Sequence, residues 1–310
     1  MKNNITAVTE FTLLGFQASH DIRIFLFCLL LVVYSFTISM NLLIITLVST
    51  GKNLHTPMYF FLSQLFISDI LLTTDIAPNT LHILLNNGET ISFIDCITQL
   101  YFFGASEASE CLILTVMSYD RYVAICNPLR YTAIMTSVHC VKLAVISWLL
   151  GFCIMMIIII TTSQLSFCGS NIIDHFFCDL LPLLELSCSD TSNLQFEVYF
   201  LSSPLLLIPT IIIIFSYAKI IVTTLRIPSS TGRQKAFSTC SSHLIVVSIY
   251  YWTMFSVYVL PTKGQSSTIS KVLSLLYTVF TPLINPIIYS LKNDNIKKAF
   301  HDYAKNRALS

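Results

Sequence analysis

Long apolar stretches alternate with short polar ones along the whole 310-residue chain. Each apolar stretch runs for about 20 residues or more almost without charge, enough for a helix to cross the roughly 30 Å hydrocarbon core of a bilayer. Because a chain inside lipid must satisfy its own backbone polar groups, these stretches are predicted to be α-helices. The predicted spans are Ile24–Ser49, Met58–Leu84, Ile97–Ile125, Leu143–Leu165, Glu197–Leu225, Ala236–Leu260 and Val272–Leu291. The pattern predicts an all-α protein, a bundle of seven transmembrane helices.

The composition supports this prediction. With 55% hydrophobic and only 11% charged residues, the chain has too little polar material to cover a water-exposed surface. Residues 1–310 are expected to form one domain, with residues 1–23 before the first span and residues 292–310 as a tail. The start of the chain lacks the basic, apolar and small-residue order of a removable signal peptide, so none is expected.

The lysines and arginines predict the orientation. All but four of the 17 fall on the side that holds the C-terminus, the exceptions being Lys2, Arg23, Lys263 and Lys271. By the positive-inside rule, the C-terminus is predicted to be cytoplasmic and the N-terminus extracellular. Asn4 then begins an outer Asn-Ile-Thr glycosylation sequence.

Four cysteines fall on the predicted outer side, where disulfides persist. They are Cys96, Cys168, Cys178 and Cys188. Four cysteines allow three pairings, and the spacing does not choose among them.

Acidic residues inside the predicted spans need an explanation, because each costs roughly 2.5–3.5 kcal/mol at mid-bilayer. Asp69 lies about mid-span, and Glu107 and Glu110 are three residues apart on one helix face. They serve either as structural polar contacts between helices or as a functional site. Asp75 lies nearer the outer end, where water can solvate it.

The stretch MSYDRYVAICNPLRY (Met117–Tyr131) places Asp120 and Arg121 at the inner end of the third span. Taken alone, these could be charges that reach the lipid headgroups. Further motifs in the same chain are LHTPMYFFLSQL (Leu54–Leu65), HFFCD (His175–Asp179), SY (Ser216–Tyr217), KAFSTCSSHL (Lys235–Leu244) and PLINPIIYSLKN (Pro282–Asn293). In this order they cover nearly the whole chain, which resembles the odorant receptors of tetrapod-type class II, within the rhodopsin-like (class A) G-protein-coupled receptors.

The resemblance implies an activation switch. Arg121 is held by Asp120 at rest, beside Tyr122, and Tyr217 and Tyr289 close on it in the active state. Asn285 and Pro286 form a weak point in the seventh helix, because proline removes a backbone hydrogen bond. The resemblance also places Asp69, Glu110 and Asn285 in an internal polar cluster for water, or for a sodium ion at Asp69 and Glu110. No other metal and no cofactor is implied.

The resemblance also implies a ligand pocket in the outer half of the bundle. Its residues form stripes at helical spacing on the third and sixth spans. They are Phe103, Gly104, Glu107, Ala108 and Cys111, and Tyr251, Met254, Phe255 and Tyr258. Such stripes are more often plain packing, and only the resemblance favours a pocket. Glu107, if ionised and facing the cavity, would favour an amine or a strong hydrogen-bond donor, and Trp252 is expected to add bulk nearby.

By the same resemblance, the ligand is a small volatile odorant and the partner is a heterotrimeric G protein whose olfactory stimulatory α subunit raises cyclic AMP. The receptor would lie in the plasma membrane, its basic inner face suiting both anionic lipid and the G protein. The family pattern pairs Cys96 with Cys178 and Cys168 with Cys188, while a Cys96–Cys188 bond stays open.

Other functions are weighed against this one. A receptor of the same architecture for a non-odorant metabolite stays open. A proton-coupled transporter would use intramembrane acids, but seven spans do not divide into equal repeats. A retinal receptor is excluded because Val272–Leu291 contains no lysine. An enzyme is not expected, because the chain has no phosphate-binding loop, nucleophile elbow or plausible metal motif.

Overall fold

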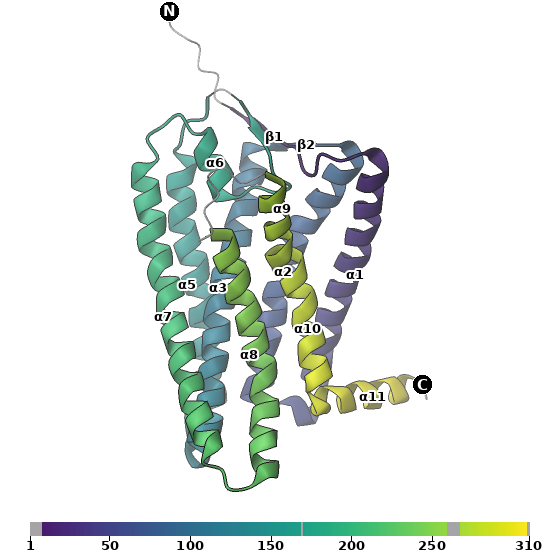
Figure 1. The fold of residues 1–310 in the computed structure, drawn as a ribbon, viewed down its shortest axis with the longest axis vertical. Helices are drawn as coiled ribbons and strands as arrows, with labels where there is room; N and C mark the ends of the chain where they lie inside the picture. The colour runs from purple at the N-terminus through teal and green to yellow at the C-terminus, as the bar shows by residue number, and fades with distance from the viewer. Residues whose placement is uncertain (1–7, 169, 259–266, 309–310) are drawn as a thin grey trace, which may run out of the picture.

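The computed structural model describes residues 8–168, 170–258 and 267–308. Figure 1 shows these residues as a bundle of long helices with a small sheet at one end and a short helix lying across the other. The long helices are α1 (His20–Thr50), α2 (Pro57–Asn86), α3 (Phe93–Cys126), α5 (Ser137–Ser163), α7 (Ser192–Leu225) and α8 (Ser230–Tyr258). A further one joins α9 (Ser267–Leu275), the π-helical turn η3 (Leu276–Phe280) and α10 (Thr281–Lys292).

The remaining elements are short and lie at the two ends. At one end, here called the sheet end, are β1 (Glu10–Leu13), β2 (Glu89–Ser92), β3 (Ile172–Ile173) and α6 (Leu180–Leu186). At the other, here called the α11 end, are η1 (Lys52–Leu54), η2 (Pro128–Arg130), α4 (Tyr131–Ile134) and α11 (Asp294–Ala308). This separation gives the molecule two different faces for two different environments.

Each predicted span coincides with a long helix over its described residues, and every one of these helices begins at least one residue, and mostly several residues, before its span. Thus α5 begins at Ser137, whereas hydrophobicity placed its start at Leu143. The Thr136 side chain accepts a hydrogen bond from the backbone N–H of His139 at 3.3 Å and so caps the helix in a polar segment. Hydrophobicity marks only the part of a helix that meets lipid, and caps decide where it starts.

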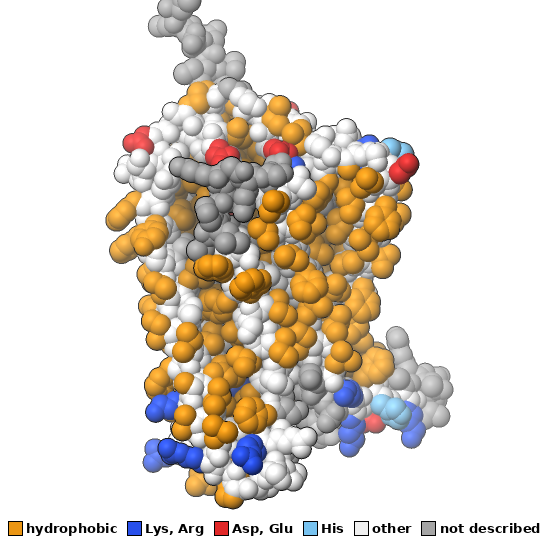
Figure 2. All heavy atoms as spheres, viewed as in Figure 1, with side chains coloured by type: hydrophobic (Ala, Val, Ile, Leu, Met, Phe, Trp, Pro, Cys, Tyr) orange, Lys and Arg blue, Asp and Glu red, His pale blue; other side chains and the backbone are white. Residues whose placement is uncertain are grey.

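The outer surface of the bundle is apolar. Among the described residues, six helices are long and apolar enough to cross a membrane, and α8 adds a further long helix. Large side chains such as Phe25, Val32 and Ile211 are about two-thirds exposed on this surface. Figure 2 shows hydrophobic side chains along the middle of the molecule, with Lys and Arg gathered toward the α11 end and acidic groups at the sheet end. Such a surface suits lipid around the middle and water at both ends.

Helix α3 occupies the centre of the bundle and packs against α2, α5 and α7. Its contact with α5 is close enough to require a glycine. A Cβ added at Gly151 would lie 2.3 Å from the Ser109 Oγ and 2.9 Å from the backbone oxygen of Ala105. Small residues that let helix backbones approach are the usual means of packing inside membranes.

A three-stranded sheet closes the sheet end, with the order β2-β1-β3. Strand β1 pairs antiparallel with β2, Glu10 facing Ser92, and parallel with β3, Leu13 facing Ile173. Phe11 and Leu13 are fully buried beneath it. Strand β1, which precedes the first helix, is therefore a part of the folded core.

Two disulfides fasten the loop between α5 and α7. Cys96 of α3 bonds Cys178, with Cα atoms 5.4 Å apart, and Cys168 bonds Cys188, with Cα atoms 5.8 Å apart. Of the three pairings that the spacing left open, the structure has the one implied by the family pattern. A Cys96–Cys188 bond is absent from it.

Candidate functional site

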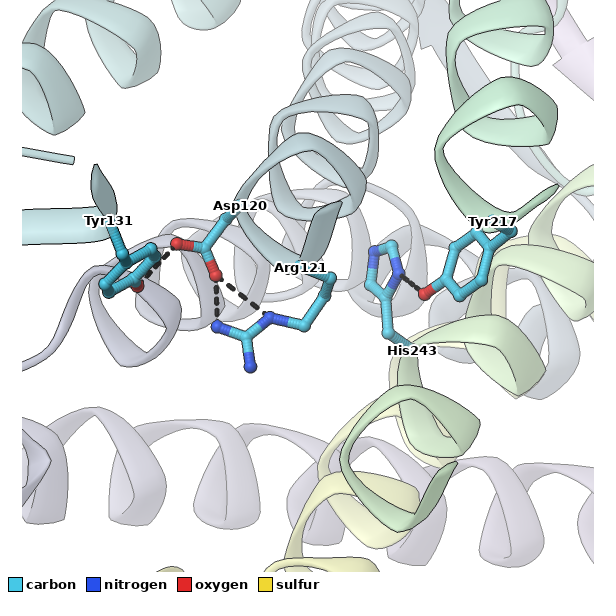
Figure 3. A network of polar contacts seen from close by, with 5 residues as sticks. All are labelled: Asp120, Arg121, Tyr131, Tyr217 and His243. Carbon is cyan, nitrogen blue, oxygen red and sulfur yellow. Dashed lines mark hydrogen bonds and ion pairs between the residues drawn. The ribbon is translucent and has the colours of Figure 1, made fainter. Parts of the chain in front are cut away.

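The first candidate site lies where α3 reaches the α11 end. Asp120 is fully buried, and its Oδ2 accepts hydrogen bonds from Nε of Arg121 at 2.9 Å and from Nη2 of the same side chain. Its Oδ1 accepts from the Tyr131 hydroxyl at 2.8 Å. Both oxygens of the carboxylate are thus engaged (Figure 3). A buried ion pair is stable only when such additional hydrogen bonds complete it.

Tyr131 belongs to α4, beyond the end of α3. Burial and the adjacent Asp120 carboxylate raise the pKa of its phenol above the ordinary value. The phenol therefore stays protonated and keeps its proton for donation to Asp120. Tyr131 is the last residue of the MSYDRYVAICNPLRY motif, and no role was predicted for it from the sequence.

A second contact joins α7 to α8 nearby. The Tyr217 hydroxyl and the His243 Nδ1 share a hydrogen bond of 2.5 Å, and the two rings are stacked with centroids 5.8 Å apart. Both side chains are buried. In Figure 3 the Arg121 side chain extends toward Asp120 and away from this pair. No role was predicted for His243, although a histidine inside a predicted span is itself a signal of function.

The other residues of the predicted switch lie around this centre. Tyr289 is buried, its ring packs edge-on against Phe66 at 6.2 Å, and its hydroxyl has no hydrogen-bond partner. Pro286 lies inside α10. Tyr122 is half-buried and packs against the core at the α11 end. In this arrangement neither Tyr217 nor Tyr289 bonds Arg121.

A polar cluster lies deeper in the bundle. The Asn285 Nδ2 donates to both carboxylate oxygens of Asp69, at 3.1 and 3.2 Å. Asp69 and Glu110 are buried, and the Glu110 Oε1 has no hydrogen-bond partner. Nearby, Asn41 Nδ2 donates to the Pro282 backbone oxygen at 3.3 Å. The cluster ties α1, α2 and α3 to the helix that contains Pro286.

Oxygen-rich surroundings suit a hard cation or water. In the described residues, no group of three or more His, Cys, Asp or Glu is arranged to hold a metal ion. Asp69 and Glu110 supply two carboxylates, and the unpartnered Oε1 of Glu110 could face such a guest. Sodium at these two residues stays a prediction.

On α3 toward the sheet end, the predicted ligand-lining residues are mostly buried. Phe103 packs against Phe177 at 5.2 Å and Tyr277 at 5.7 Å between ring centroids. Glu107, Ala108 and Cys111 are buried behind it. Gly104 points in a different direction from the other four residues, because a Cβ there would lie 2.4 Å from the Cε of Met155 on α5. This glycine faces α5.

The predicted ligand-lining residues on α8 do not all face the interior of the bundle. Phe255 is 48% exposed and Trp252 is 70% exposed, so both lie on the outer surface. Trp252 therefore adds no bulk near the pocket, contrary to expectation. The buried positions are instead Tyr250, Thr253 and Ser256. Tyr251 and Met254 are half-buried, whereas the side chain of Tyr258, like Asn4, lies outside the described residues. Helix α8 carries apolar and aromatic side chains around its whole circumference, so their spacing could not identify the face that points into the bundle.

One small cavity lies between α1, α2 and η3. Its volume is about 10 Å³, and Tyr34, Thr37 and Thr278 are among its lining residues. It has room for about one water molecule. It is too small for an odorant and lies apart from Glu107.

At the sheet end, the loop between α5 and α7 and helix α9 bring further charged residues together. Lys271 is buried, pairs with Asp174 at 2.5 Å and donates to the Gly15 backbone oxygen at 2.7 Å. Burial, together with the Lys271 cation, lowers the pKa of His175 to about 3, so this ring is neutral. Asp179 is buried as well, and burial raises its pKa to about 6.

Gln99 joins α2, α3 and this loop. Its Nε2 donates to the Asp75 backbone oxygen at 2.9 Å, and its Oε1 accepts from the Cys178 backbone N–H at 2.9 Å. The Asp75 side chain is only half-buried, but its Oδ2 is shielded from water and has no hydrogen-bond partner. The solvation expected for Asp75 therefore does not reach its Oδ2. The contacts of Gln99 fix the loop over the third helix.

Comparison with known proteins shows which family the chain belongs to. A family model described as olfactory receptor matches residues 27–305. The chain belongs to the olfactory receptor family. Human Olfactory receptor 6J1 is 47% identical over 302 residues, covering 97% of this chain and 87% of the human protein. Olfactory receptor 5G9 of Mus musculus is 44% identical over 296 residues, covering 96% and 94% of the two chains.

The fold of this olfactory receptor is that of rhodopsin. The crystal structure of squid rhodopsin matches with a TM-score of 0.71 over 93% of this chain and 86% of the other, at 15% identity. Together with the apolar helices, this confirms a seven-helix, multi-pass membrane protein. Family membership also confirms that the chain is a receptor and not an enzyme.

Proposed function

We propose that this olfactory receptor binds small volatile molecules in the half of the bundle nearer the sheet end and activates an olfactory stimulatory G protein, which raises cyclic AMP. The sheet end would face the outside of the cell and the α11 end the cytoplasm. The observation that carries the signalling role is the Asp120–Arg121 pair with its Tyr131 contact. A buried arginine held in this way can be released by a conformational change.

The charge distribution supports the orientation. Exposed Arg130, Arg226 and Lys297 lie at the α11 end, which is also rich in other Lys and Arg. Lys and Arg are retained on the cytoplasmic side of membrane proteins. The same basic surface would attract anionic lipid headgroups and acidic parts of a G protein.

The arrangement at the α11 end fits the resting member of a two-state switch. Arg121 is paired with Asp120, and Tyr217 is paired with His243. In the active state, Tyr217 and Tyr289 would turn to Arg121 as α8 moves outward. A ligand can shift such an equilibrium only by the difference between its affinities for the two states.

Helix α8 offers a physical link between ligand and switch. Toward the sheet end, the Tyr250 hydroxyl donates to the Glu107 backbone oxygen at 3.0 Å, and the Tyr251 hydroxyl lies 3.5 Å from the Cys111 Sγ. Toward the α11 end, the same helix carries His243. A molecule inserted between α3 and α8 would disturb the first contacts and so bias the position of the second.

Affinity should be modest. A volatile of about 12 heavy atoms, at roughly 0.3–0.5 kcal/mol per atom, gains about 4–6 kcal/mol. That range corresponds to dissociation constants from tens of micromolar to about millimolar. Such affinities suit a detector that must release its ligand quickly.

The test is a cyclic AMP reporter in cells that express the chain, screened with amines, acids, aldehydes, alcohols and aromatic volatiles. At least one class should raise cyclic AMP in a dose-dependent way, and Arg121→Ala should abolish the response at equal surface expression. Arg23→Ala is the matched control, because Arg23 lies in the first turn of α1, remote from the switch and from the basic surface of the α11 end. An Arg121→Ala variant that still signals to agonist would refute the switch.

A further inference from the structure

Glu107 brings a carboxylate into the interior of the bundle, in the half of α3 nearer the sheet end. The residue is only 7% exposed, and its Oε2 has no hydrogen-bond partner. Its backbone oxygen, in contrast, accepts from the Tyr250 hydroxyl at 3.0 Å. The backbone is thus fixed between α3 and α8, while one oxygen of the side-chain carboxyl is unsatisfied, an arrangement that is costly unless something completes it.

The surroundings of Glu107 add negative charge. Glu110 and Asp179 lie close enough to repel its carboxylate. None of the ion pairs among the described residues includes Glu107 or Asp179. Lys271, at the same end, is engaged with Asp174 and Gly15. The protein itself therefore places acids here without a cation to balance them.

Asp179 is held over α3 by several constraints. It follows Cys178, which is bonded to Cys96 and donates its N–H to Gln99. Its Oδ1 accepts from the Leu180 backbone N–H at 2.7 Å, and the side chain is 6% exposed. With a pKa of about 6, it is ionised at neutral pH. It places a fixed negative charge on the loop close to Glu107.

Aromatic rings lie beside these acids. Phe103 precedes Glu107 by one helical turn on the same face and packs against Phe177 and Tyr277. On the α8 side, the rings of Tyr250 and Tyr251 meet edge-on at 5.4 Å. Ring faces attract cations and also bury hydrocarbon, so the region offers two complementary features to one molecule.

We propose that the preferred agonists of this receptor are hydrophobic amines, whose ammonium group pairs with Glu107 and whose hydrocarbon body packs among the rings of Phe103 and Tyr251. Asp179 strengthens the attraction from the loop. This inference rests on the proposed function and names the ligand class of that same site. Neutral volatiles of equal size would bind more weakly, because they leave the carboxylate without a counter-charge, and carboxylic acids would be repelled.

The test compares head groups on one hydrocarbon chain. Hexylamine, hexanol and hexanoic acid are applied to cells with the cyclic AMP reporter, and benzylamine is compared with benzyl alcohol. In the unmodified receptor, amines should be the most potent and hexanoic acid inactive. Glu107→Gln should weaken the amines by about ten- to hundredfold, the loss expected for a charge-assisted contact, and should change hexanol by no more than about threefold.

Further variants separate charge from structure. Glu107→Asp keeps the charge and should restore part of the amine response, whereas Asp179→Asn should weaken amines by a smaller factor. Glu185→Gln is the matched control, because Glu185 is an exposed acid on α6 of the same loop. Surface expression is measured for every variant.

Three results would overturn the proposal. These are an unchanged amine response in Glu107→Gln, an equal loss for hexylamine and hexanol, and activation of the unmodified receptor by neutral volatiles but by no amine. The last result would leave the odorant-receptor function intact. Silence of the surface-expressed receptor toward every volatile would instead contradict the proposed function itself.

Discussion

Asp120 shows how single side chains hold the α11 end in one arrangement. One of its carboxylate oxygens binds Arg121 and the other accepts from Tyr131. The donor comes from α4, so a segment outside the bundle orients the acid that restrains the arginine. Hydrogen bonds to charged groups contribute about 1.5–3 kcal/mol, and the half-buried position of Tyr131 favours the lower part of this range.

Tyr131→Phe removes that donor and leaves the ring in place. Asp120 should then hold Arg121 less firmly, and basal cyclic AMP should rise by about tenfold, the effect of about 1.5 kcal/mol. The measurement is ligand-free reporter signal normalised to surface expression. Tyr199→Phe, at an exposed position on α7, is the control. Unchanged basal signalling would show that Tyr131 is not part of the restraint.

The two partners of the Tyr217–His243 contact are predicted to affect signalling in opposite directions when each is substituted. Both His243→Phe and Tyr217→Phe break the same hydrogen bond. The histidine variant should raise basal signalling, because α8 loses a contact with α7 while Tyr217 keeps its hydroxyl for Arg121. The tyrosine variant should lower the maximal response to agonist by about tenfold, because that hydroxyl is gone. Changes of the same sign in both variants would contradict these separate roles.

Asp179 should make stability depend on pH. Its pKa is about 6 in the folded protein against an ordinary value of 3.8, so the folded state binds the proton more tightly than the unfolded state. Stability should therefore fall as the pH rises from about 4 to about 6, by up to about 3 kcal/mol. Thermal unfolding of purified receptor across this range measures the effect. Asp179→Asn should remove that part of the slope, and an identical slope in the variant would disprove the assignment.

At the residue scale, charge and motif predicted more than spacing did. Asp120, Arg121 and Asn285 could be picked out because buried charges and amides are costly in lipid and therefore rare. The role of Tyr131 became evident only from the structure, which shows its contact with Asp120, whereas His243 had a signal in the sequence, a histidine inside a predicted span. Phe255 was misplaced because α8 carries aromatic residues all round, and an apolar stripe loses its meaning on such a helix.

At the scale of elements, the two disulfides differ in setting. Cys96–Cys178 closes 82 residues and is fully buried, whereas Cys168–Cys188 closes 20 and is exposed. Chain entropy alone gives about 4.5 kcal/mol for the longer closure and about 3.3 for the shorter. The longer one also ties the loop to the central helix.

Paired serine substitutions should reveal this difference. Loss of Cys96 and Cys178 should abolish most surface expression, because α3 and the loop above it separate. Loss of Cys168 and Cys188 should reduce expression only by about half or less and should leave agonist potency within about threefold. Flow cytometry and dose–response curves supply the two readouts. Equal losses in both double variants would contradict the ranking.

Helices were predictable from sequence and the sheet was not. A span of about 20 apolar residues has no other stable form in lipid. Strand β1 has only four residues, and its partners lie about 80 and 160 positions away, so no local pattern indicates the pairing. Burial of Phe11 and Leu13 comes from that long-range pairing.

On the scale of the whole molecule, an apolar middle separates a basic end from an end with acidic groups (Figure 2). This asymmetry predicts one orientation in the membrane. An epitope tag at the N-terminus should be stained on intact cells, and a tag at the C-terminus only after permeabilisation. A tag inserted between Ser229 and Ser230, at the turn between α7 and α8, should behave like the C-terminal one. The reverse staining pattern would contradict the proposed orientation.

The central place of β1 in the sheet has a consequence for biosynthesis. Its residues are the first of the described part to leave the ribosome, yet β3 is made roughly 160 residues later, after four of the long helices. At about 5–20 residues per second, the first strand waits on the order of ten seconds for its last neighbour. In the proposed orientation, the edge of β1 that later pairs with β3 is open to lumenal chaperones during this interval, so the earliest described segment of the nascent receptor would be among the last to mature.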